Sequence, residues 1–398
     1  MSLKVNKYWI NGDRVLWCII ALLVIFSFLP VFSASSNLAY VIGKGTPLGY
    51  LFKHFIIMAL GFSLLFVVHK IPYTYYKGIS VLMLPVVFLL LIYTGLQGNI
   101  ISGANANRWI EIPIIGFTFQ TSTLASMILM IYVAHYMSKS DSRYLKINYT
   151  FWLLWIPIIS FTMLIFPSNF STAAMLFLMV VILMFIGGYP FKQLFYILSL
   201  CIIFFLIFII SIKAFPDIIP NRIDTWTSRI NNFISGKVED NYQIEHSKIA
   251  IASGGIYGKG AGKSVMKNFL PQSSSDFIYA IIVEEYGLVG GLTLIFLYLL
   301  LLFRIVVIIH KTSSLFGKLL VVGLGIPIVF QAFTNIAVNV QLFPVTGQTL
   351  PLVSSGGTSA WITFIALGII LSVSASSQSN NQENMTNNKI LKVLSETE

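Results

Sequence analysis

The sequence predicts an all-α polytopic membrane protein, a bundle of about ten transmembrane helices, from its composition and from its long apolar segments. Of 398 residues, 57% are hydrophobic and 10% are charged, and the mean hydropathy is +0.84. A water-soluble domain of this length does not need so apolar a composition, so lipid is the expected solvent for most of the chain. Cys18 and Cys201 both lie in apolar segments and lack the spacing of a disulfide framework or a cysteine metal site.

Ten apolar segments are long enough to cross about 30 Å of hydrocarbon as continuous helices. They lie at residues 15–35, 48–68, 79–96, 121–137, 151–167, 170–187, 193–212, 277–303, 315–338 and 356–375. The first segment follows three basic residues, as a signal peptide would. No small-residue cleavage pattern comes after it, so we expect it to be retained as a helix.

Basic residues in the short loops predict which side of the membrane each loop occupies. Most fall on the side that carries both termini, whereas the opposite side has only Lys44, Lys53 and Arg108 in its short loops and span ends. We therefore predict cytoplasmic termini and a large outer loop, residues 213–276. That loop is basic, which indicates either an anionic ligand outside the membrane or attraction to anionic headgroups.

The predicted domain organisation is simple. Residues 1–376 form one transmembrane domain that includes the outer loop. Residues 377–398 are rich in Ser, Asn and Gln and are expected to be a disordered cytoplasmic tail.

A glycine-rich segment, residues 254–264, has the composition of a phosphate-cradling loop. It is not a Walker A loop, because Tyr257 occupies a position that requires glycine and ATP is absent from the predicted outer side. The alternative is a flexible turn before the next helix.

Asp276 stands at the predicted outer boundary of the eighth span. A partly desolvated carboxylate near basic residues is suited to general base catalysis, and an aspartate is also an ordinary helix N-cap. Glu284 and Glu285 lie about two turns deeper, where charge is costly. We expect at least one of them to pair with a cation or a backbone donor rather than to catalyse.

Residues 344–359 contain too many Pro, Gly and polar residues to form a helix, although a predicted span lies on each side. Non-helical backbone at that depth must be buried in protein or line a wet cavity. Its small residues would let either a substrate chain or a neighbouring helix approach closely.

This segment resembles the signature P-V-T-G-x-T-L-P-x-V-S-x-G-G-[ST]-S of the SEDS family, which comprises FtsW, RodA and a sporulation member. A second resemblance begins at residues 240–243, continues through the glycine-rich segment to residues 275–278, and ends at residues 284–290. With Arg108-Trp109-Ile110, the resemblance covers nearly the whole chain. Residues 345–350 are more similar to the cell-division members than to the elongation members.

The resemblance implies a peptidoglycan glycosyltransferase that polymerises lipid II at the outer face of the cytoplasmic membrane during cell division. Asp276 would be the general base that activates the acceptor 4-hydroxyl for attack on the donor anomeric carbon, with lipid pyrophosphate as leaving group. Candidates for binding lipid II and its pyrophosphate are Arg108, Arg222, Arg229, Lys248, Lys263, Gln243, Ser354 and Ser355. Structural or auxiliary roles are expected for Glu284, Glu285, Trp109, Pro344, Gly347, Pro351, Gly356 and Gly357.

The resemblance also implies partners. These are a class B penicillin-binding protein that acts as transpeptidase, other divisome proteins, the lipid II substrate and membrane lipid, with no nucleic acid. No metal site is expected in the chain itself, since no carboxylate cluster indicates one, although a divalent cation accompanying the pyrophosphate is compatible with the chemistry. The implied location is the cytoplasmic (inner) membrane, at the division septum.

Three segments depart from the family pattern. At residues 120–126, Thr123 and Ser126 replace a glutamate and a lysine, which suggests that an ion pair is missing. Residues 166–172 and 272–275 also differ, which puts auxiliary roles there in doubt, while Asp276 is retained.

Three alternatives stay open: a lipid II flippase or other transporter, an elongation polymerase similar to RodA, and a scaffold that only recruits a partner. A flippase needs a path across both leaflets. The unusual polar segments, residues 97–120, 213–276 and 339–356, are all predicted on the outer side, which favours chemistry at one face.

Overall fold

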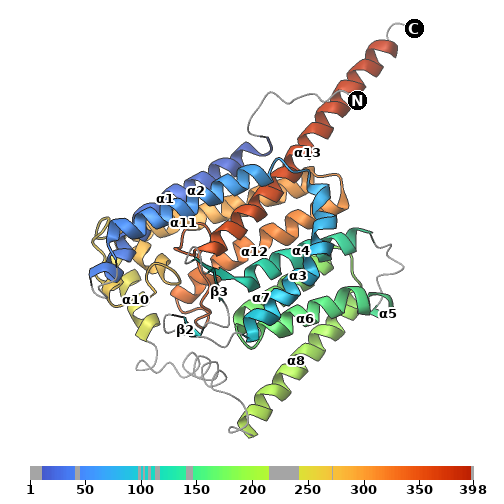
Figure 1. The fold of residues 1–398 in the computed structure, drawn as a ribbon. Coiled ribbons are helices and arrows are strands. Elements are labelled where there is room, and N and C mark those ends of the chain that lie inside the picture. Colours follow the sequence, from blue (N-terminus) through green and yellow to red (C-terminus); the bar gives the residue numbers. More distant parts are fainter. Residues whose placement is uncertain are drawn as a thin grey trace.

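The computed structural model is a bundle of helices (Figure 1). It describes residues 11–40, 45–96, 100–101, 104–105, 109–112, 117–139, 147–214, 242–270 and 272–395. Each of the ten predicted spans coincides with a helical segment. These segments are α1 (Arg14–Tyr40), α2 (Pro47–Val68), α3 (Tyr76–Leu96), α4 (Thr121–Lys139), the π-helix η3 (Phe151–Trp155) with α6 (Ile156–Ile165), α7 (Phe170–Ile186), α8 (Phe191–Ala214), α11 (Ile278–Lys311), α12 (Leu315–Asn339) and α13 (Thr358–Ser395). The predicted fold class is confirmed.

Six helices of the described residues are long and apolar enough to cross a membrane. They lie in α1, α2, the 3-10 turn η1 (Tyr73–Tyr75) with α3, α11, α12 and α13, and three shorter apolar helices lie at residues 151–165, 170–186 and 191–203. Helix α4 is more polar than these helices except α13, and it packs against α3, α6, α7, α12 and α13. A helix surrounded by protein does not need an apolar face toward lipid.

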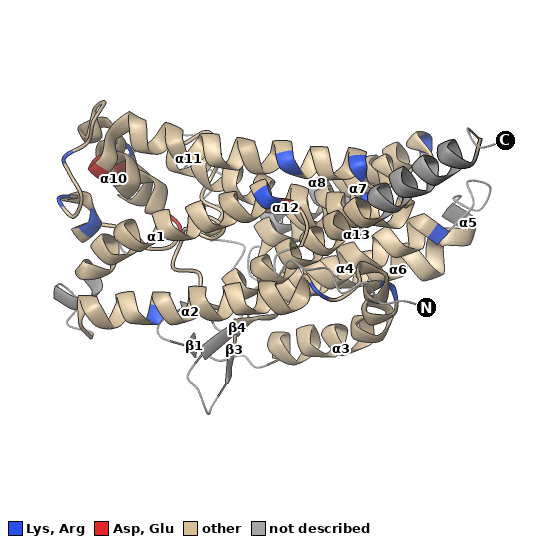
Figure 2. Cartoon of the chain, turned by 90° about the horizontal axis from the view of Figure 1, so that it is seen from above, with Lys and Arg blue, Asp and Glu red and all other residues tan. Residues whose placement is uncertain are grey.

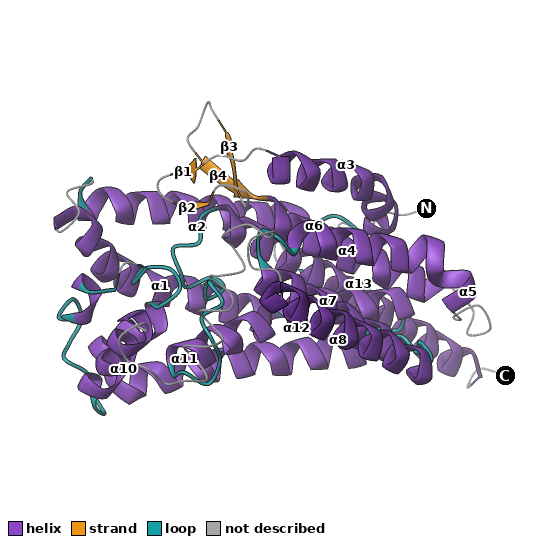
Figure 3. Ribbon diagram, turned by 90° about the horizontal axis from the view of Figure 1, so that it is seen from below, coloured by secondary structure: helices purple, strands orange, loops and turns teal. Residues whose placement is uncertain are grey.

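Two short hairpins connect α3 to α4. Strands β1 (Ile100–Ile101) and β2 (Ala104–Asn105) pair antiparallel, as do β3 (Trp109–Ile112) and β4 (Phe117–Gln120). The register of the second hairpin pairs Trp109 with Gln120, the residue directly before α4. Figure 3 shows both hairpins at an edge of the bundle, and β4 contacts α13.

Small residues allow α2 and α13 to pack closely. A Cβ atom built on Gly61 would lie 2.2 Å from the ring of Phe364, and one on Gly368 would lie 2.9 Å from Val68. The indole nitrogen of Trp361 also donates to the carbonyl oxygen of Ile57 at 2.9 Å. Glycine is therefore needed where these two helices meet.

The bundle end opposite α10 is held by an ion pair between α1 and α11. Arg304 binds both carboxylate oxygens of Asp13, with Nε 3.2 Å from Oδ1. The same Oδ1 accepts the backbone N–H of Leu16 at 2.9 Å, so Asp13 also caps α1. Figure 2 shows lysines and arginines near both ends of the long helices.

Helix α13 extends beyond the predicted end of its span. The sequence indicates a disordered tail from residue 377, whereas the backbone is helical as far as Ser395. No proline or glycine follows Gly368 within this helix, so no residue of either type ends it.

The predicted outer loop contains ordered structure that the apolar pattern does not indicate. Helix α10 (Tyr242–Gly254) and the 3-10 turn η5 (Met266–Asn268) lie within it. Helix α10 packs against α11, α12 and η5. Residues 215–241 of the same loop lie outside the described residues.

Candidate active site

Asp276 lies in a turn that leads into α11, and it is half-buried. Helix α11 begins at Ile278, its N-cap is Phe277, and no side chain caps it. The interpretation of Asp276 as the helix N-cap is therefore wrong.

The segment between α12 and α13 holds this turn through backbone contacts. The N–H of Ser355 donates to the carbonyl of Ser274 at 2.9 Å, and the hydroxyl of Ser354 donates to the carbonyl of Ser275 at 2.6 Å. The Ser354 oxygen also accepts the N–H of Leu350 at 2.7 Å. Ser354 is buried and Ser355 is exposed. Both predicted substrate-binding serines thus border Asp276, and the Ser354 hydroxyl is already occupied by the turn.

The segment predicted to be non-helical, residues 344–359, is non-helical as far as Gly357, and α13 already begins at Thr358. Residues 350–354 are buried in protein. The hydroxyl of Tyr298, from α11, donates to the carbonyl of Pro351 at 2.5 Å. Gln331 Nε2, from α12, donates to the carbonyl of Thr349 at 2.8 Å. These side chains satisfy carbonyls that have no helical partner, which is the condition for irregular backbone at membrane depth.

Two asparagines of α12 bind the backbone of Asp276 itself. Asn335 Nδ2 lies 2.7 Å from the Asp276 carbonyl oxygen and 2.7 Å from that of Gln348. Asn339 Nδ2 lies 3.0 Å from the same Asp276 oxygen. The turn is therefore fixed from two sides, by α12 and by the segment that follows it.

The glycine-rich segment binds an internal anion. Glu284 Oε1 forms an ion pair with Lys259 at 2.7 Å, and the same carboxylate accepts N–H groups of Val265 and Met266. The hydroxyl of Ser264 donates to Glu284 Oε2 at 2.5 Å. The predicted pairing of a buried glutamate is confirmed. The phosphate-cradling interpretation is wrong for these donors, because they bind a carboxylate of the chain.

Glu285 joins the same segment to α1. Its Oε1 accepts the hydroxyl of Ser33 and the N–H of Ser264. Lys267 Nζ also donates to the Ser33 hydroxyl, at 3.1 Å. Both glutamates are almost fully buried, at 0% and 1% exposure. Both carboxylates are engaged in contacts within the chain, and their structural or auxiliary roles stay a prediction.

Close backbone contact explains two of the glycines here. A Cβ atom on Gly258 would lie 2.2 Å from the carbonyl oxygen of Glu285, and one on Gly287 would lie 2.2 Å from that of Ile256. Both residues have positive φ, +78° and +68°. Only glycine satisfies the conformation and the space at these positions.

The predicted cationic site is only partly visible. Arg108, Arg222 and Arg229 lie outside the described residues. Lys263 is exposed, and Lys248 is exposed with its Nζ 2.6 Å from Gln341 Oε1. The remaining predicted binding residue, Gln243, is half-buried in the first turn of α10. Within the described part of the chain, Gln243, Lys248 and Lys263 share no hydrogen bond with one another.

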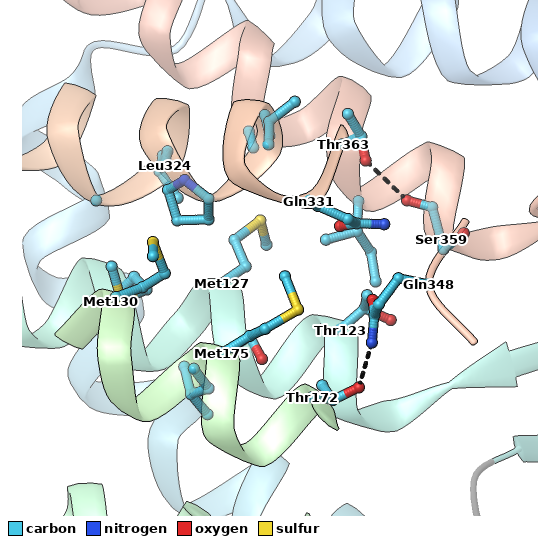
Figure 4. Close-up of a pocket in the computed structure, with 18 residues that line it drawn as sticks. Thr123, Met127, Met130, Thr172, Met175, Leu324, Gln331, Gln348, Ser359 and Thr363 are labelled. Carbon is cyan, nitrogen blue, oxygen red and sulfur yellow. Dashed lines mark hydrogen bonds between the residues drawn. The ribbon is translucent and has the colours of Figure 1, made fainter. Parts of the chain in front are cut away.

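An uncharged cavity of about 120 Å³ lies between α4, α7, α12 and α13 (Figure 4). Gln348 Nε2 donates to the hydroxyl of Thr172 at its polar end, 2.8 Å away. Its lining residues are Thr123, Ser126, Met127, Met130, Thr172, Met175, Leu176, Met179, Gly323, Leu324, Pro327, Ile328, Gln331, Gln348, Ser359, Ile362, Thr363 and Ala366. Thr123 and Ser126, which replace the charged pair of the family pattern, thus face this cavity.

Metal ligands are not clustered in the part of the chain that the structure describes. No group of three or more His, Cys, Asp or Glu residues there is arranged to hold an ion.

Comparison with known proteins identifies the family. The sequence matches the profile of the FtsW/RodA/SpoVE family, described as "Cell cycle protein", over residues 13–379. The chain belongs to this family. Curated relatives named "Probable peptidoglycan glycosyltransferase FtsW" include one from Coxiella burnetii, 30% identical over 94% of this chain and 98% of the relative. Another, from Alcanivorax borkumensis, is 31% identical over 94% of this chain and 96% of the relative.

Solved structures have the same fold. A chain from a structure described as "Structural coordination of polymerization and crosslinking by a peptidoglycan synthase complex" has a TM-score of 0.71 and 22% identity. The match covers 92% of this chain and 98% of that one. The rod shape determining protein RodA of Thermus thermophilus has a TM-score of 0.63 and 23% identity, over 92% and 97% of the two chains. The family fold therefore extends over nearly the entire protein.

Sequence reasoning missed four residues that build this region: Lys259, Asn335, Asn339 and Gln348. The sequence does indicate a role for Asn335 and Asn339. Two asparagines four residues apart in an apolar span share one helix face, and both need buried hydrogen-bond partners. For Lys259 the indication is weaker: a buried glutamate requires a nearby cation, but the sequence does not say which one.

Proposed function

We propose that the protein is a peptidoglycan glycosyltransferase that polymerises lipid II, with Asp276 as the general base. Family membership and the names of the curated relatives support the reaction class. One observation carries the site: two separate segments bond to the turn that contains Asp276. Asn335 and Asn339 of α12 donate to the Asp276 carbonyl, and Ser354 and Ser355 donate to the carbonyls of Ser275 and Ser274. A turn held this rigidly is the arrangement expected for a catalytic group.

The proposed step is a glycosyl transfer. The Asp276 carboxylate takes the proton from the acceptor 4-hydroxyl as that oxygen bonds to the donor anomeric carbon. The bond from this carbon to the lipid pyrophosphate breaks at the same time, and pyrophosphate leaves with the bonding electrons. The protein must then stabilise the charge on the leaving group.

We propose that cations of the outer loop bind the pyrophosphate and stabilise its negative charge. Lys263 lies between Lys259 and Ser264, which both bind Glu284, and its own exposed side chain makes no hydrogen bond to that carboxylate. Arg108, Arg222 and Arg229 remain proposals from the resemblance. Fork-shaped guanidinium groups suit phosphate oxygens better than a point charge does.

A flippase is the main alternative function. The cavity between α4, α7, α12 and α13 has no charged lining residue, and an anionic pyrophosphate would be unstabilised there. The buried ion pair of Lys259 and Glu284 instead lies between the segment after α10 and α11, and Figure 2 shows acidic and basic residues around α10, at one end of the bundle. This separation favours transfer at one face over transport.

Orientation, partner and cellular role belong to the same proposal. We place α10 and the Asp276 turn outside the membrane and both termini in the cytoplasm, from the positive-inside count. A class B penicillin-binding protein is the proposed partner, supported by the fold match to a chain of a peptidoglycan synthase complex. Septal cell division, rather than elongation, is supported by the curated FtsW relatives.

The test of function is an assay with purified protein, its cognate transpeptidase and lipid II, with products separated on a gel. We expect glycan strands. A parallel assay follows a fluorescent lipid II analogue across liposomes that contain the protein. Translocation of the analogue, without strands in the presence of an active partner, would establish the flippase instead.

Orientation is tested with single cysteines in a variant that lacks Cys18 and Cys201. Tyr257→Cys lies at an 84% exposed position after α10, and Ser313→Cys lies in the exposed loop between α11 and α12. A membrane-impermeant thiol reagent should label only the first in intact cells. Labelling of only the second would reverse the proposed topology.

A further inference from the structure

The side chain of Asn339, from α12, bonds to two backbone groups at the start of α11 that would bond to each other in a regular helix. In an α-helix the N–H of residue i bonds to the carbonyl of residue i−4, which would join Ala280 to Asp276. Here Asn339 Nδ2 donates to the Asp276 carbonyl at 3.0 Å, and Asn339 Oδ1 accepts the Ala280 N–H at 3.3 Å. The side-chain amide is thus inserted between the two groups.

The contact is part of a buried pair. Asn335 and Asn339 are 1% and 0% exposed and lie one turn apart on α12, so both amides face the same turn. Because the Asp276 and Gln348 carbonyls only accept hydrogen bonds, Asn335 must present its nitrogen to them. The Asp276 carbonyl therefore receives two donors from α12.

We infer that Asn339, supported by Asn335, is the positioning residue that keeps Asp276 out of α11 and directs its carboxylate away from the helix. This inference rests on the proposed role of Asp276 as base. The Ala280 N–H also donates to the Phe277 carbonyl at 3.1 Å. Without the inserted amide, the same N–H could turn to the Asp276 carbonyl and form the helical bond. Helix α11 would then start earlier, and helical backbone at Asp276 would turn its side chain toward another direction.

Asn335 adds a second constraint, because it links the turn to Gln348. Gln348 in turn donates to Thr172 at the start of α7. The Asp276 carbonyl is consequently held at a fixed place relative to the segment between α12 and α13. Positioning of the base lowers the barrier to the reaction, while the asparagines that position it do not bind the substrate. Loss of these contacts should therefore affect kcat and not KM.

The test compares purified variants with the cognate transpeptidase present. Asn339→Leu preserves side-chain size and removes both amide contacts, and we expect kcat to fall roughly 100-fold with KM for lipid II nearly unchanged. Asn335→Leu, which leaves the Asn339 amide in place, should also lower kcat. This variant replaces Asn339→Leu in the test if Asn339→Leu does not fold. Ser247→Ala is the matched control. Its buried hydroxyl donates to the Asn339 carbonyl at 2.9 Å and lies 3.4 Å from Asn339 Oδ1, but its removal keeps both contacts of the Asn339 amide with the turn and α11.

A second readout does not depend on catalysis. In a variant that lacks Cys18 and Cys201, Asp276→Cys is labelled with a thiol reagent, alone and combined with Asn339→Leu or Ser247→Ala. We expect Asn339→Leu to change the labelling rate and Ser247→Ala to leave it unchanged. Folded Asn339→Leu and Asn335→Leu proteins with kcat and labelling like those of Ser247→Ala would overturn the inference. Activity in Asp276→Asn would refute the proposed base, while the labelling rates would still decide the positioning.

Discussion

Gly347 borders the carboxylate of Asp276: a Cβ atom built on Gly347 would lie 3.6 Å from Asp276 Oδ2. Gly347 has a φ of +69°, in the left-handed region that favours glycine. Both the backbone conformation and the open space beside the carboxylate therefore depend on this residue.

Gly347→Val should lower turnover strongly, because the added methyl groups would crowd the carboxylate and the acceptor hydroxyl that must reach it. Gly357→Val is the matched control, since Gly357 also has positive φ, +55°, and a Cβ atom there meets nothing within 4 Å. The backbone strain of about 1–2 kcal/mol is common to both. Polymerisation rates at equal amounts of folded protein compare them, and equal rates would remove Gly347 from the site.

Gly287→Ala should prevent stable folding, because its Cβ atom would meet the carbonyl oxygen of Ile256 at 2.2 Å. Gly262→Ala has a similar backbone strain, at φ +79°, but open space around the Cβ, and should cost only about 1–2 kcal/mol. Thermal unfolding in detergent measures the difference. Equal midpoints for the two variants would contradict the close contact between the glycine-rich segment and α11.

Glu284→Gln should loosen the glycine-rich segment. The amide keeps the shape of the carboxylate but loses the charge that binds Lys259. Its NH₂ group would also face N–H and O–H groups that now donate to the carboxylate. Loss of a hydrogen-bonded charge costs about 1.5–3 kcal/mol. Exposed Lys263→Ala should change stability by less than about 0.5 kcal/mol. Thermal midpoints and limited proteolysis after Lys259 measure both effects, and a Glu284→Gln protein as stable as Lys263→Ala would argue against the cluster.

The uncharged cavity predicts how the protein responds when the charged residues of the family pattern are restored at positions 123 and 126. Ser126→Lys alone would put an unpaired charge into an uncharged cavity and should destabilise the protein by about 3 kcal/mol or more. Thr123→Glu together with Ser126→Lys should recover part of that loss, because residues three apart on α4 are neighbours. Thermal unfolding of the single and double variants tests this coupling. Additive losses would show that the two side chains do not meet.

The helices were predictable because their signal is local. Each apolar segment must satisfy its own backbone in lipid, so its length alone indicates a helix. Helix α10 and the hairpins around Trp109 were not predicted, since neither has a long apolar segment and both are held by contacts with other elements.

Much less of the site was predictable. Asp276, Glu284 and Gly347 were identified from charge at a membrane boundary and from the family signature. Their partners were not, because Asn335 lies 59 residues from Asp276 and Lys259 lies 25 residues from Glu284. Only the fold shows that the glycine-rich donors bind a carboxylate of the chain.

The central claim is that Asp276 accepts the acceptor proton, and turnover of lipid II by Asp276→Asn tests it most directly. The amide has nearly the same shape, and the contacts from Asn335, Asn339 and Ser354 go to backbone atoms that the substitution keeps. With the cognate transpeptidase present, we predict a folded protein with a thermal midpoint near that of the wild type and no glycan strands. A folded Asp276→Asn protein that polymerises lipid II at a rate near that of the wild type would contradict the account.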